Sequence, residues 1–343
     1  MTLATTVLDE FRLDYEKSNM DWAEHRLSIY GAFETFMRDT PNLVPGWQEL
    51  VAGRTYENQT ISVPVIQRAT YSTSSSRSCT RETAENTSAY EDLSFTTLET
   101  GFQMLKAQYA SNKIKYMQDF NRKMVDVQRT FLATLEAVAV ANLNTNKSAV
   151  NNANGNPYTV ASNIMLVPEE DNEQYFNELS QIMLQNDFGG LMYNVVASPR
   201  VSALVKFLNA QGGGNSTNLA FQFGDTNFAY TRSMTVPTGY RDTTYAMPEG
   251  SLGYIPWVDI DSQMGNVSGD GHEWFKQMLP ILGHEVGVLY SSTCADKSAT
   301  LTGLDATLHE SWQFSFDYDF INAYNSDSST YPGTIFRADF SKT

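Results

Sequence analysis

The feature that most constrains the fold is a long stretch, Phe102 to Asn154, that contains neither glycine nor proline. Inside it, apolar side chains recur every three or four residues, the period of one face of an α-helix. They are Ile114, Met117, Phe120, Met124, Val127, Phe131, Leu135 and Val138. The pattern predicts a single helix over residues 105–142, which at 1.5 Å per residue would be about 57 Å long. Such a helix is several times longer than the usual three turns.

The segment before this helix, residues 55–100, has a different character. It is rich in serine and threonine, contains the β-branched islands Ile61-Ser62-Val63 and Val65-Ile66, and shows no helical period. These features predict a long polar β-hairpin that leads into the helix. A loop of this length without a core of its own is anomalous inside a compact domain. It is expected instead to lie across an adjacent subunit, with few contacts to its own body.

Charge and composition exclude several classes of protein. The 343 residues carry a formal net charge of −16, which argues against a dedicated nucleic-acid binder. No apolar stretch approaches the roughly 20 residues of a membrane span, and the first residues lack the basic start and apolar block of a secretory signal. The cysteines, Cys79 and Cys294, are isolated in the sequence. They suit a reducing compartment and cannot form a metal cluster by themselves.

Residues 1–50 are predicted to form an acidic arm with helical pieces, since they hold nine acids against four bases. One apolar face is formed by Trp22, Leu27, Tyr30, Phe33 and Met37, and Pro41 and Pro45 are expected to stop the helix. This face packs either on the arm's own domain or on a neighbouring copy.

The long helix is net positive in a strongly negative chain. One interpretation is a solvated face with i,i+4 pairs such as Lys115–Asp119 and Arg122–Asp126. The other is contact with a negatively charged neighbour or with DNA.

The rest of the chain predicts an α+β body. A helix is expected from Pro168 through Met183 to a stop at Gly189-Gly190, and a second helix is opened by Ser198 as N-cap and Pro199 in its first turn. Strands are expected at 191–197, 219–223, 227–236, 243–247, 285–291 and 334–340. Strict alternation from Trp312 to Phe320 predicts a strand with one buried and one wet face.

No constellation of residues predicts catalysis. His272, His284 and His309 each precede a glutamate, but none extends to the His-Glu-x-x-His spacing of zinc sites, and His284 and His309 are interpreted as structural. Asp259, Asp261 and Gly265 faintly resemble a calcium loop, but Gln263 occupies the position of a required acid. The glycines at 212–214 follow a helix and so cannot cradle phosphate at a helix start. No catalytic, cofactor-binding or metal-binding residues are therefore predicted, and the chain is not expected to be an enzyme.

Taken in order, these parts resemble the major capsid protein of tailed bacteriophages, with the Hong Kong 97-type fold. The stretch from Thr244 to Gly253 also looks like the polar-turn-and-glycine runs of the axial domain in that family. The resemblance implies five regions: an N-terminal arm at 1–50, an extended loop at 51–104, a peripheral domain with the spine helix at 105–168, an axial domain at 169–308, and a return to the peripheral domain at 309–343.

The resemblance also implies a function. Such a subunit self-assembles, as hexamers and pentamers, into the icosahedral shell that encloses the double-stranded DNA genome of a tailed phage. Expected partners are other copies of the chain, portal, scaffolding and decoration proteins, and packaged DNA through weak non-specific contact, with no cofactor and no membrane. The expected location is the virion, and the host cytoplasm during assembly. Because the chain starts directly at the arm, scaffolding is expected to be a separate or already removed segment.

Two alternatives stay open. An encapsulin-like shell of a bacterial compartment shares this fold, and an unrecognised acidic enzyme is a third interpretation.

Two further expectations follow from the residues. The apolar stripe of the long helix should pack on the sheet that contains Trp312, Phe314 and Phe316. The extended loop holds Arg68, Arg77 and Arg81 but no lysine, so isopeptide cross-links from the loop are not expected.

Overall fold

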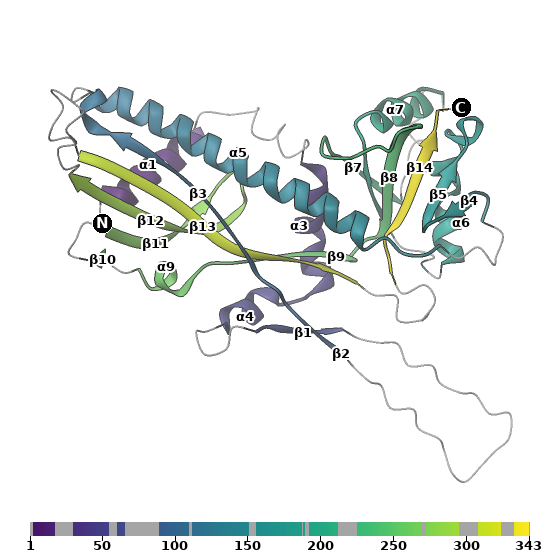
Figure 1. Ribbon diagram of the computed structural model, residues 1–343, viewed down its shortest axis with the longest axis horizontal. Coiled ribbons are helices and arrows are strands. Elements are labelled where there is room, and N and C mark those ends of the chain that lie inside the picture. Colours follow the sequence, from purple (N-terminus) through teal and green to yellow (C-terminus); the bar gives the residue numbers. More distant parts are fainter. Residues whose placement is uncertain are drawn as a thin grey trace, which may run out of the picture.

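The computed structural model describes most of the chain (Figure 1). The described residues are 3–17, 30–54, 60–65, 89–109, 112–150, 156–186, 188, 192–211, 225–265, 267–268, 272–294, 308–323 and 333–342. Within them the β structure consists of two six-stranded sheets and one two-stranded hairpin. The two sheets lie side by side along the longest axis, and the long helix crosses the first sheet and ends beside the second (Figure 1).

The long helix, α5, spans Lys113–Thr145, so its expected start at residue 105 is wrong. Residues before it form strand β3 (Thr96–Leu105) and the short 3₁₀ helix η1 (Lys106–Tyr109). The strand continues to Leu105 because its backbone pairs with His309 on the neighbouring strand. Asn112 then caps α5 by accepting a hydrogen bond from the backbone N–H of Lys115 at 3.2 Å.

The first sheet is built around β13 (Leu308–Asn322), the alternating strand expected from the sequence. Its strand order is β10-β11-β12-β13-β3, and β9 pairs with the far half of β13. The other strands are β9 (Leu252–Trp257), β10 (Val267–Ser268), β11 (His272–Leu279) and β12 (His284–Cys294). A short helix, α9 (Ile260–Met264), joins β9 to β10.

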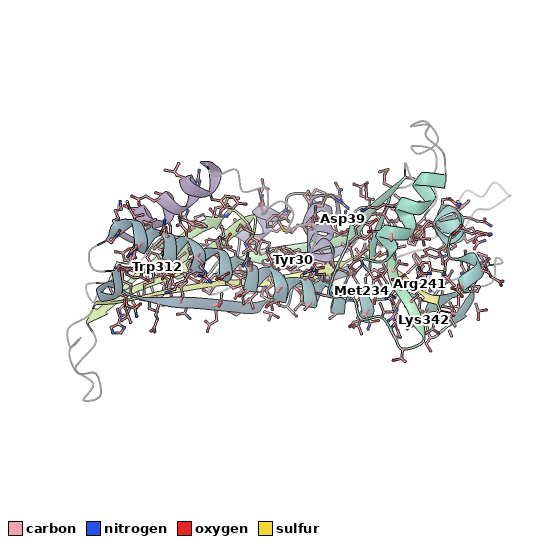
Figure 2. All side chains as sticks on the ribbon, turned by 90° about the horizontal axis from the view of Figure 1, so that it is seen from above. Tyr30, Asp39, Met234, Arg241, Trp312 and Lys342 are labelled. Atoms are coloured by element: carbon pink, nitrogen blue, oxygen red, sulfur yellow. The ribbon has the colours of Figure 1, made fainter. Side chains whose placement is uncertain are left out.

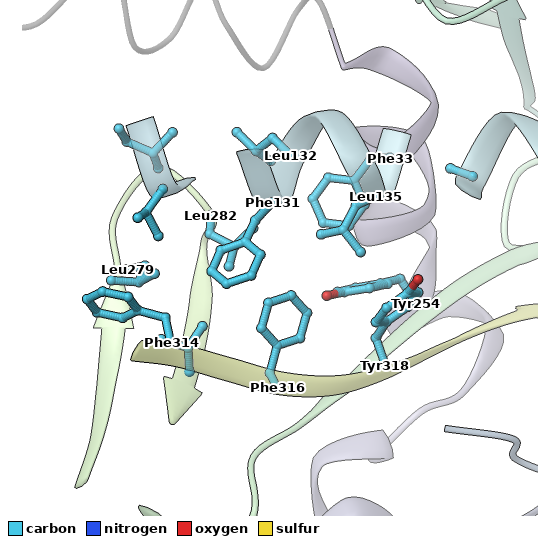
Figure 3. Close-up of a cluster of buried hydrophobic side chains, with 14 of the residues drawn as sticks. Phe33, Phe131, Leu132, Leu135, Tyr254, Leu279, Leu282, Phe314, Phe316 and Tyr318 are labelled. Atoms are coloured by element: carbon cyan, nitrogen blue, oxygen red, sulfur yellow. The ribbon is translucent and has the colours of Figure 1, made fainter. Parts of the chain in front are cut away.

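The apolar stripe of α5 packs on this sheet, as expected. The Phe131 ring lies 5.1 Å from that of Phe316 in an edge-to-face contact, and the Phe120 ring lies 5.0 Å from that of Trp312. Figure 2 shows Trp312 beside α5 at one end of the body, and Figure 3 shows Phe131 and Leu135 facing the sheet. Alternation along β13 produces this arrangement, since every second side chain points at the helix.

The second sheet has the strand order β4-β5-β14-β8-β6-β7. Its strands are β4 (Thr159–Ala161), β5 (Ile164–Val167), β6 (Tyr193–Ala197), β7 (Thr226–Tyr230), β8 (Tyr240–Pro248) and β14 (Phe336–Ser341). The accompanying helices are η2 (Glu169–Asp171), α6 (Tyr175–Gln185) and α7 (Val201–Gln211). A separate apolar core holds this sheet and α6 together, including Tyr175, Phe176, Ala338 and Phe340.

The N-terminal region belongs largely to its own subunit. Helix α1 (Leu3–Lys17) buries Leu8 and Phe11 in the main core, and α3 (Gly31–Leu43) buries Phe33 and Phe36 there. Of the two alternatives for the arm, the described residues support packing on its own domain. Helix α3 continues past Pro41, which therefore does not stop it, and a short helix α4 (Trp47–Ala52) follows.

Helix α3 also joins the two sheets. Asp39 accepts hydrogen bonds from the Asn194 amide of β6 at 2.9 Å, and the Thr40 hydroxyl oxygen accepts one from the backbone N–H of Tyr254 in β9 at 2.8 Å. At its start, Glu136 of α5 accepts hydrogen bonds from the backbone N–H groups of Ala32 and Phe33. A side chain at Gly31 would meet the Tyr230 backbone at 2.6 Å, so only glycine fits there.

The five regions implied by the resemblance do not coincide with the two sheets. Residues 252–294, placed in an axial domain (169–308), form strands of the first sheet with β13. The last strand, placed in a return to the peripheral domain (309–343), pairs with β5 and β8 of the second sheet. The chain therefore passes from the first sheet to the second twice. These pairings join residues far apart in sequence, which local patterns do not reveal.

Several expected features match, shift or lie outside the described residues. The expected strand at 227–236 ends at Tyr230, and the helix after Pro168 is split into η2 and α6. Outside the described residues lie Trp22, Leu27, Cys79, the glycines at 212–214 and the expected strand at 219–223. The mixed content of helices and strands, in the order arm, hairpin, long helix and sheets, confirms the expected α+β fold class.

Candidate functional site

The hairpin that leaves the body is the first candidate for an assembly surface. Strands β1 (Ser62–Val65) and β2 (Ala89–Asp92) pair antiparallel and point away from both sheets (Figure 1). The tip expected between them, residues 66–88, lies outside the described residues. The expectation of few contacts with the body is therefore tested only at the base of the hairpin.

The base of the hairpin is fixed to its own body by an apolar cluster. Ile61, Val63 and Leu93 are buried with Ile255 of β9 and Ile321 of β13. Close by, the backbone N–H of Ser94 donates a hydrogen bond to Asp319 at 2.7 Å. Burial raises the pKa of the Asp319 carboxyl, and this hydrogen bond opposes the rise. The described part of the extended loop is thus anchored, contrary to the expectation of few contacts.

Arg54 forms a second anchor beside the hairpin. Its guanidinium lies 4.2 Å from the centre of the Phe95 ring and 3.9 Å from the Trp257 ring. It also pairs with Asp317 at 3.1 Å, and Asp317 accepts a further hydrogen bond from the Thr97 hydroxyl at 2.7 Å. The planar cation therefore joins the segment leading into the hairpin, the segment leaving it and the first sheet. Sequence analysis missed Arg54, because its aromatic partners are distant in sequence.

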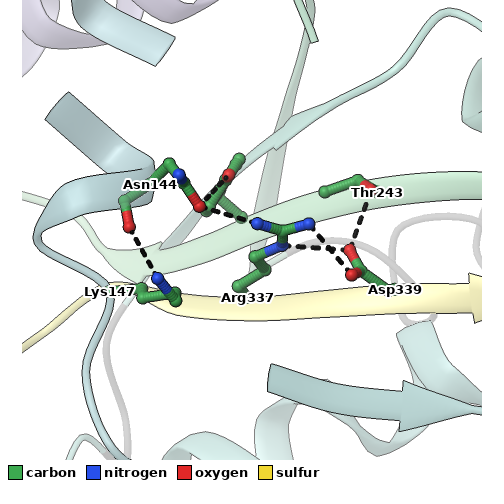
Figure 4. Close-up of polar contacts among 6 residues, drawn as sticks. Asn144, Lys147, Thr243, Arg337 and Asp339 are labelled. Atoms are coloured by element: carbon green, nitrogen blue, oxygen red, sulfur yellow. Dashed lines mark hydrogen bonds and ion pairs between the residues drawn. The ribbon is translucent and has the colours of Figure 1, made fainter. Parts of the chain in front are cut away.

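A buried ion pair lies where α5 meets the second sheet (Figure 4). Arg337 donates two hydrogen bonds to Asp339, at 3.0 and 2.9 Å, and one to the Asn144 side chain at 2.6 Å. Asp339 also accepts a hydrogen bond from Thr243 at 2.8 Å. Because the partners satisfy both charges, this network can fix the end of α5 against β14 without leaving a charge unpaired.

A buried carboxylate joins the other end of α5 to the first sheet. Glu310 of β13 accepts hydrogen bonds from the hydroxyls of Tyr116 at 2.5 Å and Tyr290 at 3.2 Å. Burial, followed by the hydrogen bond to Glu310, raises the pKa of the Tyr116 phenol. The hydroxyl is therefore protonated at neutral pH and serves as a donor, which is a structural role.

The exposed face of α5 is basic, but the expected charge pairs do not form. Lys123, rather than Lys115, pairs with Asp119 at 3.1 Å, and Arg129, rather than Arg122, pairs with Asp126 at 3.0 Å. Lys115 and Arg122 are exposed. Each acid thus pairs with the base that follows it along the helix, in the orientation that also agrees with the helix dipole.

His284 and Asp259 of the calcium-like segment form hydrogen bonds within the fold. His284 is buried, with Nδ1 at 2.8 Å from the Glu285 carbonyl oxygen and Nε2 at 2.9 Å from the Tyr254 hydroxyl. Burial lowers its pKa to about 4. Asp259 caps α9 by accepting a hydrogen bond from the Ser262 backbone N–H at 2.6 Å. Within the described ranges, no three His, Cys, Asp or Glu side chains gather closely enough to hold a metal ion.

A cavity of about 620 Å³ lies between α3, α4 and the first sheet. It is lined mainly by apolar side chains, including Met37, Trp47 and Met278, with His284 on its wall. The Trp257 indole N–H, also on this wall, is buried without a hydrogen-bond partner among the described residues. The His284 ring nitrogens face the Tyr254 hydroxyl and a backbone carbonyl, and its low pKa makes it a poor base at neutral pH.

Ser198, expected as an N-cap, has a different contact. Its hydroxyl donates a hydrogen bond to Asp242 at 2.8 Å, and α7 begins at Val201. Burial raises the pKa of the Asp242 carboxyl, and the hydrogen bond from the Ser198 hydroxyl opposes this rise.

No helix of the described residues is long and apolar enough to cross a membrane.

Comparisons with known proteins give structural matches alone. No protein-family model and no curated protein matches the sequence. A solved structure from Mycobacterium phage Adephagia is similar, with a TM-score of 0.46 and 10% identity, covering 83% of this chain and 86% of that one. The capsid of the cyanophage P-SCSP1u gives a TM-score of 0.45 and 10% identity, with coverage of 83% and 84%. The capsid of Ralstonia phage GP4 gives 0.44 and 9%, with coverage of 83% and 84%.

Proposed function

We propose that this chain is the major capsid protein of a tailed phage. It assembles with other copies of itself, as hexamers and pentamers, into an icosahedral shell around the double-stranded DNA genome. The observation that carries this function is the hairpin β1–β2, which projects from the body while its base is locked by Arg54 and the cluster around Ile61. A rigidly held projection gives a subunit reach toward its neighbours without a large globular interface.

The remaining architecture supports the same function. The long helix α5 packs along the first sheet and ends at the buried Arg337–Asp339 pair, so the elongated body is braced at both ends. Closed shells need many copies joined by heterologous contacts. Each contact can be weak, because several neighbours engage at once and multiply their effect.

The net charge is compatible with a container for DNA. At −16 the chain repels the genome on the whole, which permits packaged DNA to move, whereas a basic inner wall would bind it tightly. Further partners in this function are portal, scaffolding and decoration proteins, with weak non-specific contact to DNA. The location is the virion, after assembly in the host cytoplasm.

Expression of the full chain, followed by negative-stain microscopy and sedimentation, tests this function. Closed shells of uniform diameter are the expected result. Protein that stays monomeric at high concentration, in the presence of co-expressed scaffolding protein, would contradict it. Shells that enclose protein cargo in place of DNA in their native host would indicate an encapsulin-like compartment instead.

A further inference from the structure

One end of the second sheet gathers the ends of five strands. β5 and β14 run parallel, β8 runs antiparallel to β14 and to β6, and β6 and β7 run parallel. The carboxyl ends of β5, β14, β6 and β7 and the amino end of β8 therefore lie at the same end. Figure 1 shows the C-terminus and α7 there, on the side of the molecule away from the hairpin.

Among the exposed cations at this end, three form what we term the basic corner. They are Arg200 after β6, Arg241 in β8 and Lys342 after β14. Ser341 pairs with Tyr240, so Lys342 and Arg241 extend from neighbouring strands, and Figure 2 shows them close together. The acid among them, Asp242, is buried under the hydrogen bond from Ser198 and lies within electrostatic reach of both arginines.

Four acids follow β5 at the same end and form the acidic corner. They are Glu169, Glu170, Asp171 and Glu173, of which the three glutamates are exposed. Val167 pairs with Phe340, so the acidic corner begins one strand away from Lys342. Since strands lie about 4.8 Å apart, the acids after β5 are about 14 Å from Arg200 after β6, three strands away.

These opposite charges are not paired within the described residues. Among these described residues, the one ion pair of either corner joins Arg241 to its buried neighbour Asp242, at 3.8 Å. Corners of opposite sign that lie side by side on one copy become complementary when a second copy is rotated next to it. A heterologous contact, in which the acidic corner of one copy meets the basic corner of the next, repeats from copy to copy and closes into a ring when the rotation divides a full turn.

We propose that the acidic corner of one copy docks on the basic corner of the next copy, and that this contact closes rings of the protein. The partner is thus a second copy of this chain. The role of the rings as hexamers and pentamers rests on the proposed function, whereas the contact itself can be measured in solution.

Charge reversal in the full chain tests the contact. Arg241→Glu with Lys342→Glu makes both corners acidic, and Glu169→Lys with Glu170→Lys and Glu173→Lys makes both basic. We expect each charge-reversed variant to associate at least about tenfold more weakly than the wild type, because like charges then face each other. Lys115→Glu with Arg122→Glu, on the exposed face of α5, makes the same change in net charge as the first variant and should associate as the wild type does. Circular dichroism and thermal unfolding verify that each variant is folded.

Mixing the two charge-reversed variants gives the decisive measurement, because one partner is then acidic and the other basic at both corners. Analytical ultracentrifugation should show association restored, with oligomers larger than dimers. No association in the mixture, undiminished association of either variant alone, or an equal loss in the α5 control would overturn the contact. Association that stops at dimers would overturn the head-to-tail ring. If the wild type forms no shells, the proposed function fails, while the mixture still reports on the contact.

Discussion

Phe131 shows how a single side chain ties the long helix to the first sheet. Its ring is 1% exposed and meets Phe316 edge to face. Phe131→Ala is expected to lower the free energy of unfolding by about 3–5 kcal/mol, since truncation removes a buried ring and leaves a cavity. Urea unfolding measures this loss. Ile114→Ala, on the same helix but 71% exposed, should change it by less than about 0.5 kcal/mol. A loss below about 1 kcal/mol for Phe131→Ala would contradict the packing.

His284 makes the stability depend on pH. Burial lowers its pKa from 6.5 to about 4, so the unfolded chain binds a proton between these values while the folded chain does not. Stability contributed by neutral His284 is therefore present at neutral pH and is lost as the pH falls through this window. Between about pH 7 and about pH 4.5, the wild type should lose about 2 kcal/mol more than His284→Gln, since each pKa unit corresponds to about 1.4 kcal/mol.

The comparison with His284→Gln is needed because other groups respond in the opposite sense. Burial raises the pKa of Asp39 and Glu136, so their protonation in acid favours the folded state. Both carboxyls are present in both proteins and cancel in the difference. Urea unfolding at several pH values provides the two curves, and parallel curves would show that His284 does not titrate as its burial requires.

Substitutions of Arg54 test whether a planar cation is needed at the base of the hairpin. Arg54→Ala removes the contacts with Phe95 and Trp257 and the ion pair with Asp317. We expect a loss of about 2 kcal/mol in the free energy of unfolding, the upper range for a partly desolvated cation–π contact. Arg54→Lys should recover less than half of this, because an ammonium cannot stack on both rings. Equal stability of Arg54→Lys and wild type would show that charge alone suffices.

At the scale of elements, the extended loop should be needed for assembly and not for folding. Deletion of residues 70–88 removes the polar tip and leaves β1, β2 and the anchors at Ile61 and Leu93 in place. The variant is expected to be soluble and folded, with the thermal unfolding of the wild type, yet to form no shells under negative-stain microscopy. A deletion of residues 151–154, part of the Asn-rich segment that follows α5 in the sequence, serves as the control. Normal particles from the 70–88 deletion would show that the loop is not needed for assembly.

The elements also show how far the sequence could predict the fold. Local periodicity located α5 and β13 well, because each buries one face, so that apolar residues recur with the period of a helix or a strand. It misplaced the start of α5, since Phe102 to Leu105 lack breakers and their strand character comes from pairing with β13. The Asn112 cap was a signal for the true start. The contacts of Arg54 and the entry of β14 into the second sheet depend on long-range pairing, which local patterns do not encode.

At the scale of the whole particle, the shell is expected to hold without isopeptide cross-links from the extended loop. Such a link needs an amine nucleophile on the loop, near an amide carbonyl and a carboxylate that takes up the proton. Residues 55–100 contain arginines but no lysine, and arginine stays protonated. The next lysine, Lys106, follows directly after β3, whose pairing with β13 extends to Leu105, so it lies at the end of β3 opposite to the one that β2 leads into. The stability of the shell must then come from overlap of loops and arms, from Arg–carboxylate pairs, or from an added decoration protein.

Mature particles boiled in detergent should run as one band at the chain mass of 38.4 kDa. A ladder of larger species that resists reducing agent would prove this wrong.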